Sequence, residues 1–382
     1  MPHEFRVRFF TPSQEAIFQK CLQKIPKAAN IVVQPLKRVG FSGAQVFVFF
    51  PHGDNSFPFV GKIHTRASVK EEADGRARAS KYFSEANLQS FTAYHAPLAI
   101  IATHLIPNDK FGIKAEVTEL RDVLFAKGNG SANYSEADIC KIIDVLYSRN
   151  CGRTFENIRT ARRELGSEYQ RYLRKSASKR LLQSWMGKYS GDRQIEIYGR
   201  RVPNPLIAVE KIKVIERDLP ISTIHGDLHP SNVVLDSRRD PHLIDFTWCD
   251  DGAHILKDFL VMECSIRFLG APKHLGREGQ KIVDTALLDP NSIHVDKMVS
   301  GLKKIGIDAD TISHFKRCAK LVMRLRAQAK KACKHNFDPS DYLACQALVL
   351  FGLMRYSNYP FGACARALGL ISERLYKTGY LR

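Results

Sequence analysis

The chain has 382 residues, of which 44% are hydrophobic and 10% aromatic. Such a composition provides a sizeable core and excludes global disorder. Lysine and arginine number 58 against 39 aspartate and glutamate residues, a formal net charge of +19. This excess predicts an anionic partner, which could be a nucleotide, a nucleic acid, a phosphorylated metabolite or an acidic protein surface.

The nine cysteines include no CxxC pair. Their spacing argues against a zinc ribbon or a redox motif and indicates buried free thiols in a reducing cytoplasm. The longest apolar stretch, near 342–354, is too short to cross a bilayer, and the first residues lack the apolar core of a signal peptide. We therefore expect a soluble cytoplasmic protein without a membrane partner.

The first third of the chain alternates short apolar runs with turn residues, which is typical of strands. An amphipathic helix is expected at 11–25, with Thr11 as its cap and Pro12 at its first position. A second helix, with a charged face, is expected at 68–83. Strands are predicted at 30–40, 46–50, 59–65, 96–107 and 112–120.

After about residue 120 the pattern becomes mainly helical. Helices are predicted at 136–149 and 154–185, a loop at 190–205, short strands between 222 and 246, and helices from 252 to the end. The order predicts an α+β protein with a small β-rich lobe, residues 1–120, and a larger helical lobe, residues 121–382.

The strongest local signal is HGDLHPSN at 225–232, followed by LIDF at 243–246. Asp227 and Asn232 lie five positions apart on a predicted loop between apolar strands, and Asp245 ends the next strand. Side-chain oxygens of Asn232 and Asp245 suit a hard cation such as Mg²⁺. Asp227 is then free to orient an attacking hydroxyl or to accept its proton. A polar turn with two Asx caps is the structural alternative, but the combined pattern is too rare to favour it.

HGDLHPSN with LIDF resembles the signature of the aminoglycoside phosphotransferase and choline kinase group of kinase-like enzymes. The resemblance implies a two-lobed protein kinase-like fold, with Asp227 as the catalytic base and Asn232 and Asp245 as magnesium ligands. It further implies that His225 shapes the loop and that Asp258 steadies this loop from a following helix. The predicted cofactors are ATP and Mg²⁺.

The run IDFTWCDDGAHILKDFLVMECSI is similar to a narrower branch, the ternary-complex-associated kinase-like family predicted in bacterial conflict systems. In that branch a Gly-His-x-Leu-Lys-Asp pattern leads into a helix that carries a Leu-Glu or similar pair. Here Ala253 separates Gly252 from His254, and the pair is Met262-Glu263.

A nucleotide grip is expected in the first lobe. Gly40 and Gly43 flank Ser42 in a loop between two strands, where backbone N–H groups and the hydroxyl could contact phosphate oxygens. A plain hairpin turn is the alternative.

Lys62 lies on an otherwise apolar strand, where the resemblance implies that it points into the cleft toward the α- and β-phosphates. Glu71 and Glu72 on the following helix are both candidates to pair with it, and Glu72 fits the family pattern better. The backbone of residues 116–118 is expected to meet the adenine edge.

A basic helix is predicted near 313–335. Its cations are either a solvated face or an anion-binding face for an acidic substrate or nucleic acid. They are Lys316, Arg317, Lys320, Arg324, Arg326, Lys330, Lys331 and Lys334.

Together these features predict transfer of the ATP γ-phosphoryl group to a hydroxyl of a small-molecule acceptor, whose site is expected in the helical lobe. Two alternatives stay open: a kinase-like regulator that phosphorylates a protein in a bacterial defence or signalling system, and a non-catalytic nucleotide-binding scaffold with a basic face. Thr247 in place of the glycine of Asp-Phe-Gly, and no Ala-Pro-Glu motif, argue against a standard protein kinase. The charge of +19 fits a polycationic acceptor poorly.

Overall fold

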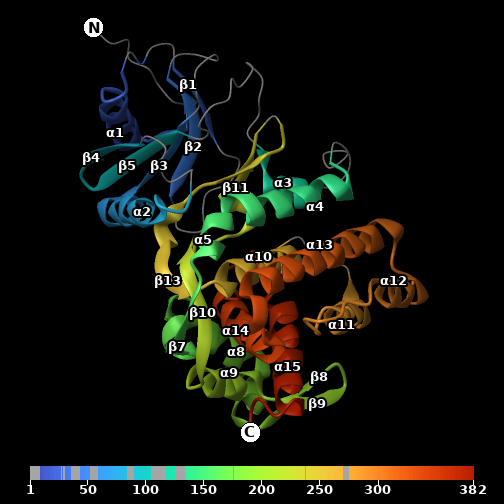
Figure 1. Cartoon of the computed structure of the whole chain (residues 1–382). Coiled ribbons are helices and arrows are strands. Elements are labelled where there is room, and N and C mark those ends of the chain that lie inside the picture. Colours follow the sequence, from blue (N-terminus) through green and yellow to red (C-terminus); the bar gives the residue numbers. More distant parts are fainter. Residues whose placement is uncertain are drawn as a thin grey trace.

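A computed structural model of the chain describes residues 9–26, 28, 31–35, 44–51, 59–83, 90–104, 118–125, 134–174, 176–236, 238–269 and 275–382. These residues form a small lobe built on an antiparallel sheet and a larger, mainly helical lobe (Figure 1). This is the α+β, two-lobed kinase-like arrangement that the sequence predicts.

The small lobe has a five-stranded antiparallel sheet in the order β1-β2-β3-β5-β4, with α1 packed on β4 and β5. Its elements are α1 (Pro12–Leu22), β1 (Val32–Pro35), β2 (Gln45–Phe50), β3 (Phe59–Thr65), α2 (Arg66–Ala79), β4 (Ser90–His95) and β5 (Leu98–His104). Thr11 caps α1, because its hydroxyl accepts a hydrogen bond from the Gln14 N–H at 3.3 Å. Phe18 on α1 packs edge-to-face against Phe47 and Phe49 of β2, which anchors this helix on the sheet.

The prediction missed strand β4. It pairs with β5 along its whole length, from Ser90 opposite Thr103 to His95 opposite Leu98. Because β4 is the edge strand, only Ala93 of its six residues is buried, so the sequence lacks the apolar alternation of a half-buried strand.

The larger lobe contains the remaining elements. They are β6 (Thr118–Glu119), α3 (Leu120–Phe125), α4 (Glu136–Val145), α5 (Gly152–Glu156), β7 (Arg159–Glu164), α6 (Leu165–Glu168), α7 (Gln170–Leu173), α8 (Ala177–Met186), β8 (Gln194–Ile197), β9 (Arg200–Pro203), α9 (Pro205–Lys213), β10 (Glu216–Ile224), β11 (Val233–Leu235), β12 (Pro241–Leu243), β13 (Asp250–His254), α10 (Leu256–Phe268), α11 (Gly276–Ala286), α12 (Val295–Lys304), α13 (Ala309–Cys333), α14 (Pro339–Leu353) and α15 (Phe361–Lys377).

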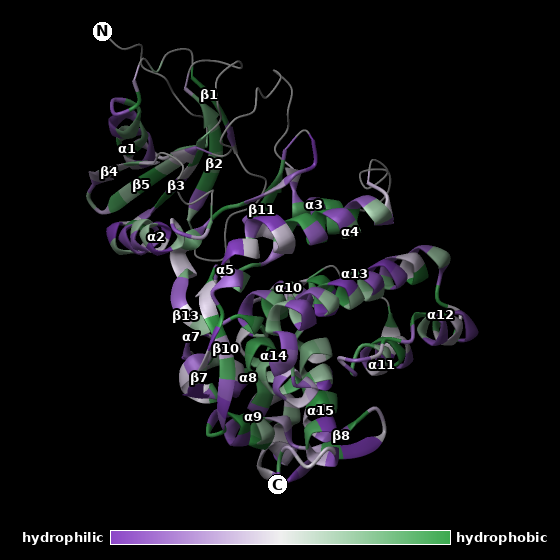
Figure 2. Ribbon diagram, in the orientation of Figure 1, coloured by the Kyte–Doolittle hydropathy of each residue, from purple (hydrophilic) through white to green (hydrophobic). Residues whose placement is uncertain are grey.

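Two sequence predictions in this lobe are wrong. The long helix expected at 154–185 is interrupted by strand β7, which pairs with β10 and is mostly hydrophilic (Figure 2). The loop expected at 190–205 contains the hairpin β8–β9. This hairpin turns through Tyr198 and Gly199, both with positive φ, as a tight two-residue turn requires.

Helix α10 lies at the centre of the larger lobe, and all thirteen of its residues are buried. Glu263 in this helix is completely buried and is held by Arg326 of α13 through contacts of 2.6 and 2.9 Å. Tyr342 and Gln346 of α14 donate hydrogen bonds to the same carboxylate. A buried charge is tolerated only when it is paired and hydrogen-bonded, and here one carboxylate joins three helices.

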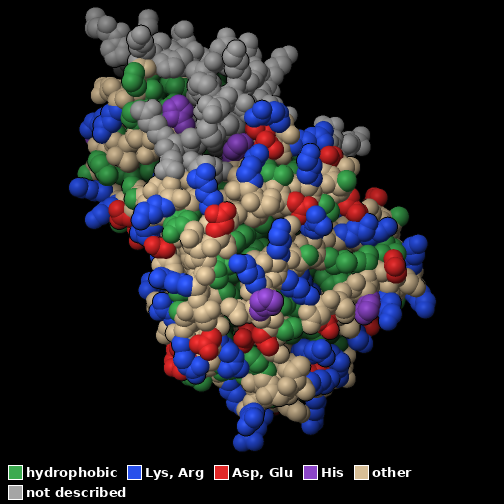
Figure 3. All heavy atoms as spheres, viewed as in Figure 1, with side chains coloured by type: hydrophobic (Ala, Val, Ile, Leu, Met, Phe, Trp, Pro, Cys, Tyr) green, Lys and Arg blue, Asp and Glu red, His purple; other side chains and the backbone are tan. Residues whose placement is uncertain are grey.

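The basic helix predicted near 313–335 covers all of α13 except its first four residues, and several of its cations are engaged within the chain. Arg326 binds the buried Glu263, while Lys320 and Arg324 form ion pairs with Glu136 and Asp144 of α4. Lysine and arginine side chains on the face in Figure 3 are spread among acidic ones and do not gather in one patch. None of the described helices is long and apolar enough to cross a membrane.

Candidate active site

The HGD motif directly follows strand β10 and forms a tight loop. Gly226 has φ +85°, and a Cβ at this position would lie 2.1 Å from the carbonyl oxygen of Trp248. Both the conformation and the close approach therefore require glycine. The Asp258 carboxylate on α10 accepts hydrogen bonds from the N–H groups of His225 at 2.8 Å and Gly226 at 2.7 Å. Asp258 thus lies where the resemblance implied, beneath the loop.

His225 is completely buried and connects the loop to the next strand pair. Its Nε2 is 2.9 Å from the carbonyl oxygen of Ile244, so Nε2 carries the proton and donates to that oxygen. Its Nδ1 accepts a longer hydrogen bond, 3.4 Å, from the N–H of Asp227. The imidazole therefore fixes the main chain around Asp227.

Asn232 and Asp245 are brought together by the pairing of β11 with β12. The Asn232 carbonyl oxygen accepts a hydrogen bond from the Ile244 N–H at 3.1 Å. Ile244 thus lies opposite Asn232, and Asp245 is the next residue in the chain. The Asn232 side-chain amide donates to the Asp227 carbonyl oxygen at 2.8 Å. Its Oδ1 is then the side-chain atom available to a cation, and with the carboxylate of Asp245 it supplies the oxygen ligands that Mg²⁺ prefers.

The described residues contain no group of three or more His, Cys, Asp or Glu side chains arranged to hold a metal. A magnesium ion at Asn232 and Asp245 would therefore need further oxygens from phosphate groups and water. That is how Mg²⁺ is usually held in kinase sites, so the two residues fit a metal that arrives with the nucleotide.

Lys62 of β3 is buried and points between two carboxylates. Its ammonium lies 2.8 Å from Asp245 and 3.3 Å from Glu72 of α2. Of the two glutamates considered from the sequence, Glu72 is buried in this pair and Glu71 is exposed. The structure thus places the predicted lysine, glutamate and aspartate in one cluster.

Thr247 completes this cluster and was not predicted as a site residue. Its hydroxyl lies 3.1 Å from Lys62, 2.5 Å from Glu72 and 2.6 Å from Asp245. A hydroxyl has one proton, so Thr247 can donate to only one of the two carboxyl groups. The other short contact requires a proton on the carboxyl group itself. Burial and the charge of Asp245 raise the pKa of Glu72 to about 7, so of these two carboxyl groups Glu72 takes up a proton more readily.

The other carboxyl groups differ in their titration. Burial alone would raise the pKa of Asp245, but the Lys62 ammonium and the hydrogen bonds to this carboxylate hold its pKa well below the usual range. Burial and the negative charge of Asp245 raise the pKa of Asp227 to about 7, although its side chain is 29% exposed. The pKa values of two carboxylates in one site are therefore pushed apart, as in many acid–base catalysts.

Helix α2 is locked against the Asp245 loop. A Cβ added at Gly75 would lie 1.9 Å from the carbonyl oxygen of Phe246, so only glycine allows this approach. The Phe246 N–H donates to Glu72 at 3.0 Å. These contacts hold Glu72, and through it Lys62, in a fixed position relative to Asp245.

Three predicted residues of the nucleotide grip, Gly40, Ser42 and Gly43, lie outside the described residues. The same holds for residues 116 and 117 of the expected adenine-binding connection. Thr118, the third residue of that segment, begins β6, which pairs with β11 beside the HGD loop.

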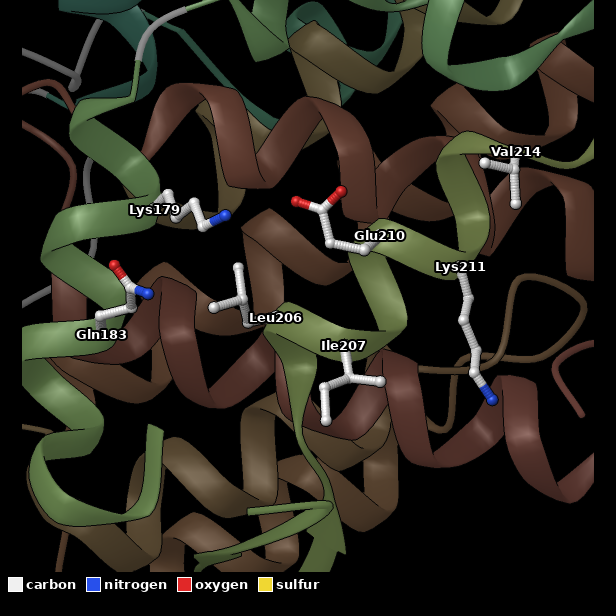
Figure 4. Close-up of a pocket in the computed structure, with 7 residues that line it drawn as sticks. All are labelled: Lys179, Gln183, Leu206, Ile207, Glu210, Lys211 and Val214. Atoms are coloured by element: carbon white, nitrogen blue, oxygen red, sulfur yellow. The ribbon is translucent and has the colours of Figure 1, made fainter. Parts of the chain in front are cut away.

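A shallow pocket of about 460 Å³ lies elsewhere, between α8 and α9. Leu206, Ile207 and Val214 line it, with Lys179 and Lys211 at its sides (Figure 4). It includes none of the residues that the motifs identify.

The lysine, the paired glutamate, the HGD loop and the following aspartate, distributed over these two lobes, define a kinase-like fold. The profile described as "Ternary complex associated domain 9" matches residues 149–351. Because this match spans more than half of the chain, the protein belongs to that family.

Among solved structures, a thermostable mutant of aminoglycoside phosphotransferase APH(4)-Ia in its apo form is 9% identical, with a TM-score of 0.45 over 94% of this chain and 97% of that one. Choline kinase LicA from Streptococcus pneumoniae is 11% identical, with a TM-score of 0.39 over 93% and 98%. An aminoglycoside-3'-phosphotransferase of type VIII is 12% identical, with a TM-score of 0.39 over 81% and 100%. No curated protein matches the sequence.

Proposed function

We propose that this protein is an ATP-dependent phosphotransferase that moves the γ-phosphoryl group to a hydroxyl of a small-molecule acceptor. The observation that carries the proposal is the convergence of Lys62, Glu72 and Asp245 within hydrogen-bonding distance, close to the HGD loop that bears Asp227. A scaffold without catalysis would not need this combination of charges, which costs free energy to bury.

Each residue has a separate task in this reaction. Lys62 binds the phosphates of the nucleotide, and Glu72 holds the ammonium in place. Asn232 and Asp245 hold Mg²⁺, which when bound neutralises charge on the phosphate oxygens. Asp227 orients the acceptor hydroxyl and accepts its proton as the oxygen–phosphorus bond forms. A pKa of about 7 leaves Asp227 partly ionised near neutral pH, which suits a general base.

A small-molecule acceptor is favoured over a protein because Thr247 replaces the glycine of the protein-kinase motif. In this chain the Thr247 side chain bridges Glu72 and Asp245, so this segment is fastened to α2. A protein kinase uses the corresponding segment as a movable switch.

Calorimetric titration of ATP in the presence and absence of Mg²⁺ tests the proposal. Wild type should bind ATP with a clear dependence on magnesium, and Asp245→Ala should lose this dependence. Asp240→Ala is a matched control, because Asp240 is a partly exposed aspartate just before β12 that pairs with Arg149. A magnesium response in Asp245→Ala equal to that of the control would place the metal elsewhere, and no nucleotide binding by wild type would refute the function.

A further inference from the structure

Three arginine side chains that are partly or fully withdrawn from solvent pair with carboxylates. Arg326 and Arg267 bind Glu263, and Arg217 binds Asp341 at 2.9 Å. Such pairing is expected, because a guanidinium cannot lose its charge when it leaves water.

The half-buried Arg355, just after α14, is held by neutral groups instead. One of its terminal nitrogens donates to the carbonyl oxygen of Tyr172 at 2.8 Å and the other to the hydroxyl of Tyr356 at 2.9 Å. Its Nε is buried and has no hydrogen-bond partner among the described residues. Arg355 also forms no ion pair with a described carboxylate, so its positive charge is not balanced by a neighbouring side chain.

Arg171 on α7, directly before Tyr172 in the chain, is an exposed cation. It donates to the carbonyl oxygen of Trp248 at 3.0 Å, and its guanidinium lies 5.8 Å from the centre of the Trp248 ring. Among the described residues it too has no ion pair with a carboxylate. The Trp248 ring meets the Tyr172 ring edge-to-face, with 5.7 Å between the ring centroids.

This group of side chains is attached to the HGD loop. The Tyr172 hydroxyl donates to the carbonyl oxygen of Gly226 at 2.9 Å, and the Trp248 carbonyl oxygen packs against the Gly226 Cα. Arg171 therefore contacts Trp248, and Arg355 contacts Tyr172. Both Trp248 and Tyr172 touch Gly226, which precedes Asp227. Asp227, the proposed catalytic carboxylate, directly follows Gly226 in the chain.

We propose that the acceptor is a hydroxyl compound that carries an anionic group, a phosphate or a carboxylate, which Arg171 and Arg355 bind. This inference rests on the proposed phosphotransferase function and adds the substrate class. A guanidinium offers paired N–H donors that match both anions. An anionic acceptor would be repelled by the triphosphate and by Asp227, and two cations at this position offset that repulsion.

The transfer itself is balanced without another reactant. The bond from the γ-phosphorus to the bridging oxygen of ATP breaks, and its electron pair leaves with ADP. A bond forms from the acceptor oxygen to the same phosphorus, and the hydroxyl proton passes to Asp227.

The test separates a cell extract by ion exchange into cationic, neutral and anionic metabolite pools and incubates each with the full-length protein, Mg²⁺ and ATP radiolabelled at the γ-phosphate. We expect labelled product from the anionic pool. Labelled product from only the neutral or cationic pool overturns the inference. The inference also fails if the protein binds Mg-ATP but none of the three pools gives labelled product. If the protein fails to bind Mg-ATP, the proposed function fails instead.

Substitutions of the two arginines test whether they bind the anionic group of the acceptor. Arg171→Ala and Arg355→Ala should each raise the KM for the anionic acceptor about tenfold or more, with a smaller change in kcat. Arg355→Lys should recover part of this loss, because it keeps the charge. Arg201→Ala on β9 is the matched control, since Arg201 is exposed in the distant β8–β9 hairpin. An acceptor KM in both alanine variants equal to that of Arg201→Ala would contradict the assignment.

Discussion

The Lys62 ammonium lies 2.8 Å from the carboxylate of Asp245, which follows 183 residues later in the chain. Lys62→Met removes the charge that both Asp245 and Glu72 contact, and we expect kcat/KM for ATP to fall ~10²-fold or more. Lys70→Met, on the exposed side of α2, is the control and should change kcat/KM by less than about twofold. Steady-state kinetics with varied ATP distinguish the two, and equal effects would mean that Lys62 does not touch the nucleotide.

The contact between α2 and the Asp245 loop predicts a second effect. Gly75→Ala places a methyl group 1.9 Å from the Phe246 carbonyl oxygen, so helix and loop must separate. We expect a loss of ~1–3 kcal/mol in the free energy of unfolding, with weaker Mg-ATP binding. Gly152→Ala in α5 is the matched control, because nothing lies within 4 Å of a Cβ at that position. Similar urea midpoints for the two variants would contradict this packing.

The buried Glu263–Arg326 pair predicts the largest loss of stability. Arg326→Leu leaves the Glu263 carboxylate without its bidentate partner, and we expect the free energy of unfolding to fall by ~3–5 kcal/mol. Lys320→Ala removes a cation from the same helix that is 39% exposed and pairs with Glu136, and should cost ~1 kcal/mol or less. Denaturant unfolding followed by circular dichroism measures both, and equal losses would show that α13 is not anchored through Arg326.

The buried His254 predicts how stability depends on pH. Its Nδ1 lies 2.8 Å from the Tyr169 hydroxyl, and burial lowers its pKa to about 3. Below its ordinary pKa of ~6.5 this histidine takes up a proton in the unfolded chain but not in the folded chain. The contribution of His254 to the free energy of unfolding is therefore complete above that pH and is lost as the pH falls. The loss reaches ~2 kcal/mol at about pH 5.

Urea unfolding at about pH 7 and about pH 5 measures this loss. His254→Gln should reduce the difference between the two pH values, whereas the same change at the exposed His335 should leave it as in wild type. An unchanged difference in His254→Gln would show that His254 is not the group that titrates.

Features that depend on a local sequence pattern could be predicted from the sequence. The apolar run of β3 and the HGD motif predicted a strand and a loop that the structure contains, and the phase of α2 puts Glu72 on the buried side with Val69. Strand β7 could not be read in this way, because five of its six residues are exposed and its partner β10 lies about fifty residues further along the chain. The bridging role of Thr247 depends on three contacts, two of them to residues of the other lobe, which spacing alone does not reveal.

The acceptor side shows the same limit. Arg171 and Arg355 are unremarkable in the sequence, where arginine and lysine are abundant. Their proposed role depends on contacts in the folded chain. Tyr172 and Trp248 link them to the HGD loop, and neither arginine has a carboxylate partner among the described residues.

Phosphotransfer by Asp227→Asn tests the central claim most directly. Wild type and variant are incubated with Mg-ATP and the acceptor-containing extract, and product formation is measured beside the affinity for Mg-ATP. The amide keeps the size of Asp227 but cannot accept the hydroxyl proton, so turnover should fall ~10²–10⁴-fold. Because Asp227 acts on the acceptor, Mg-ATP affinity should stay within about threefold of wild type. Equal turnover in wild type and Asp227→Asn would contradict the account.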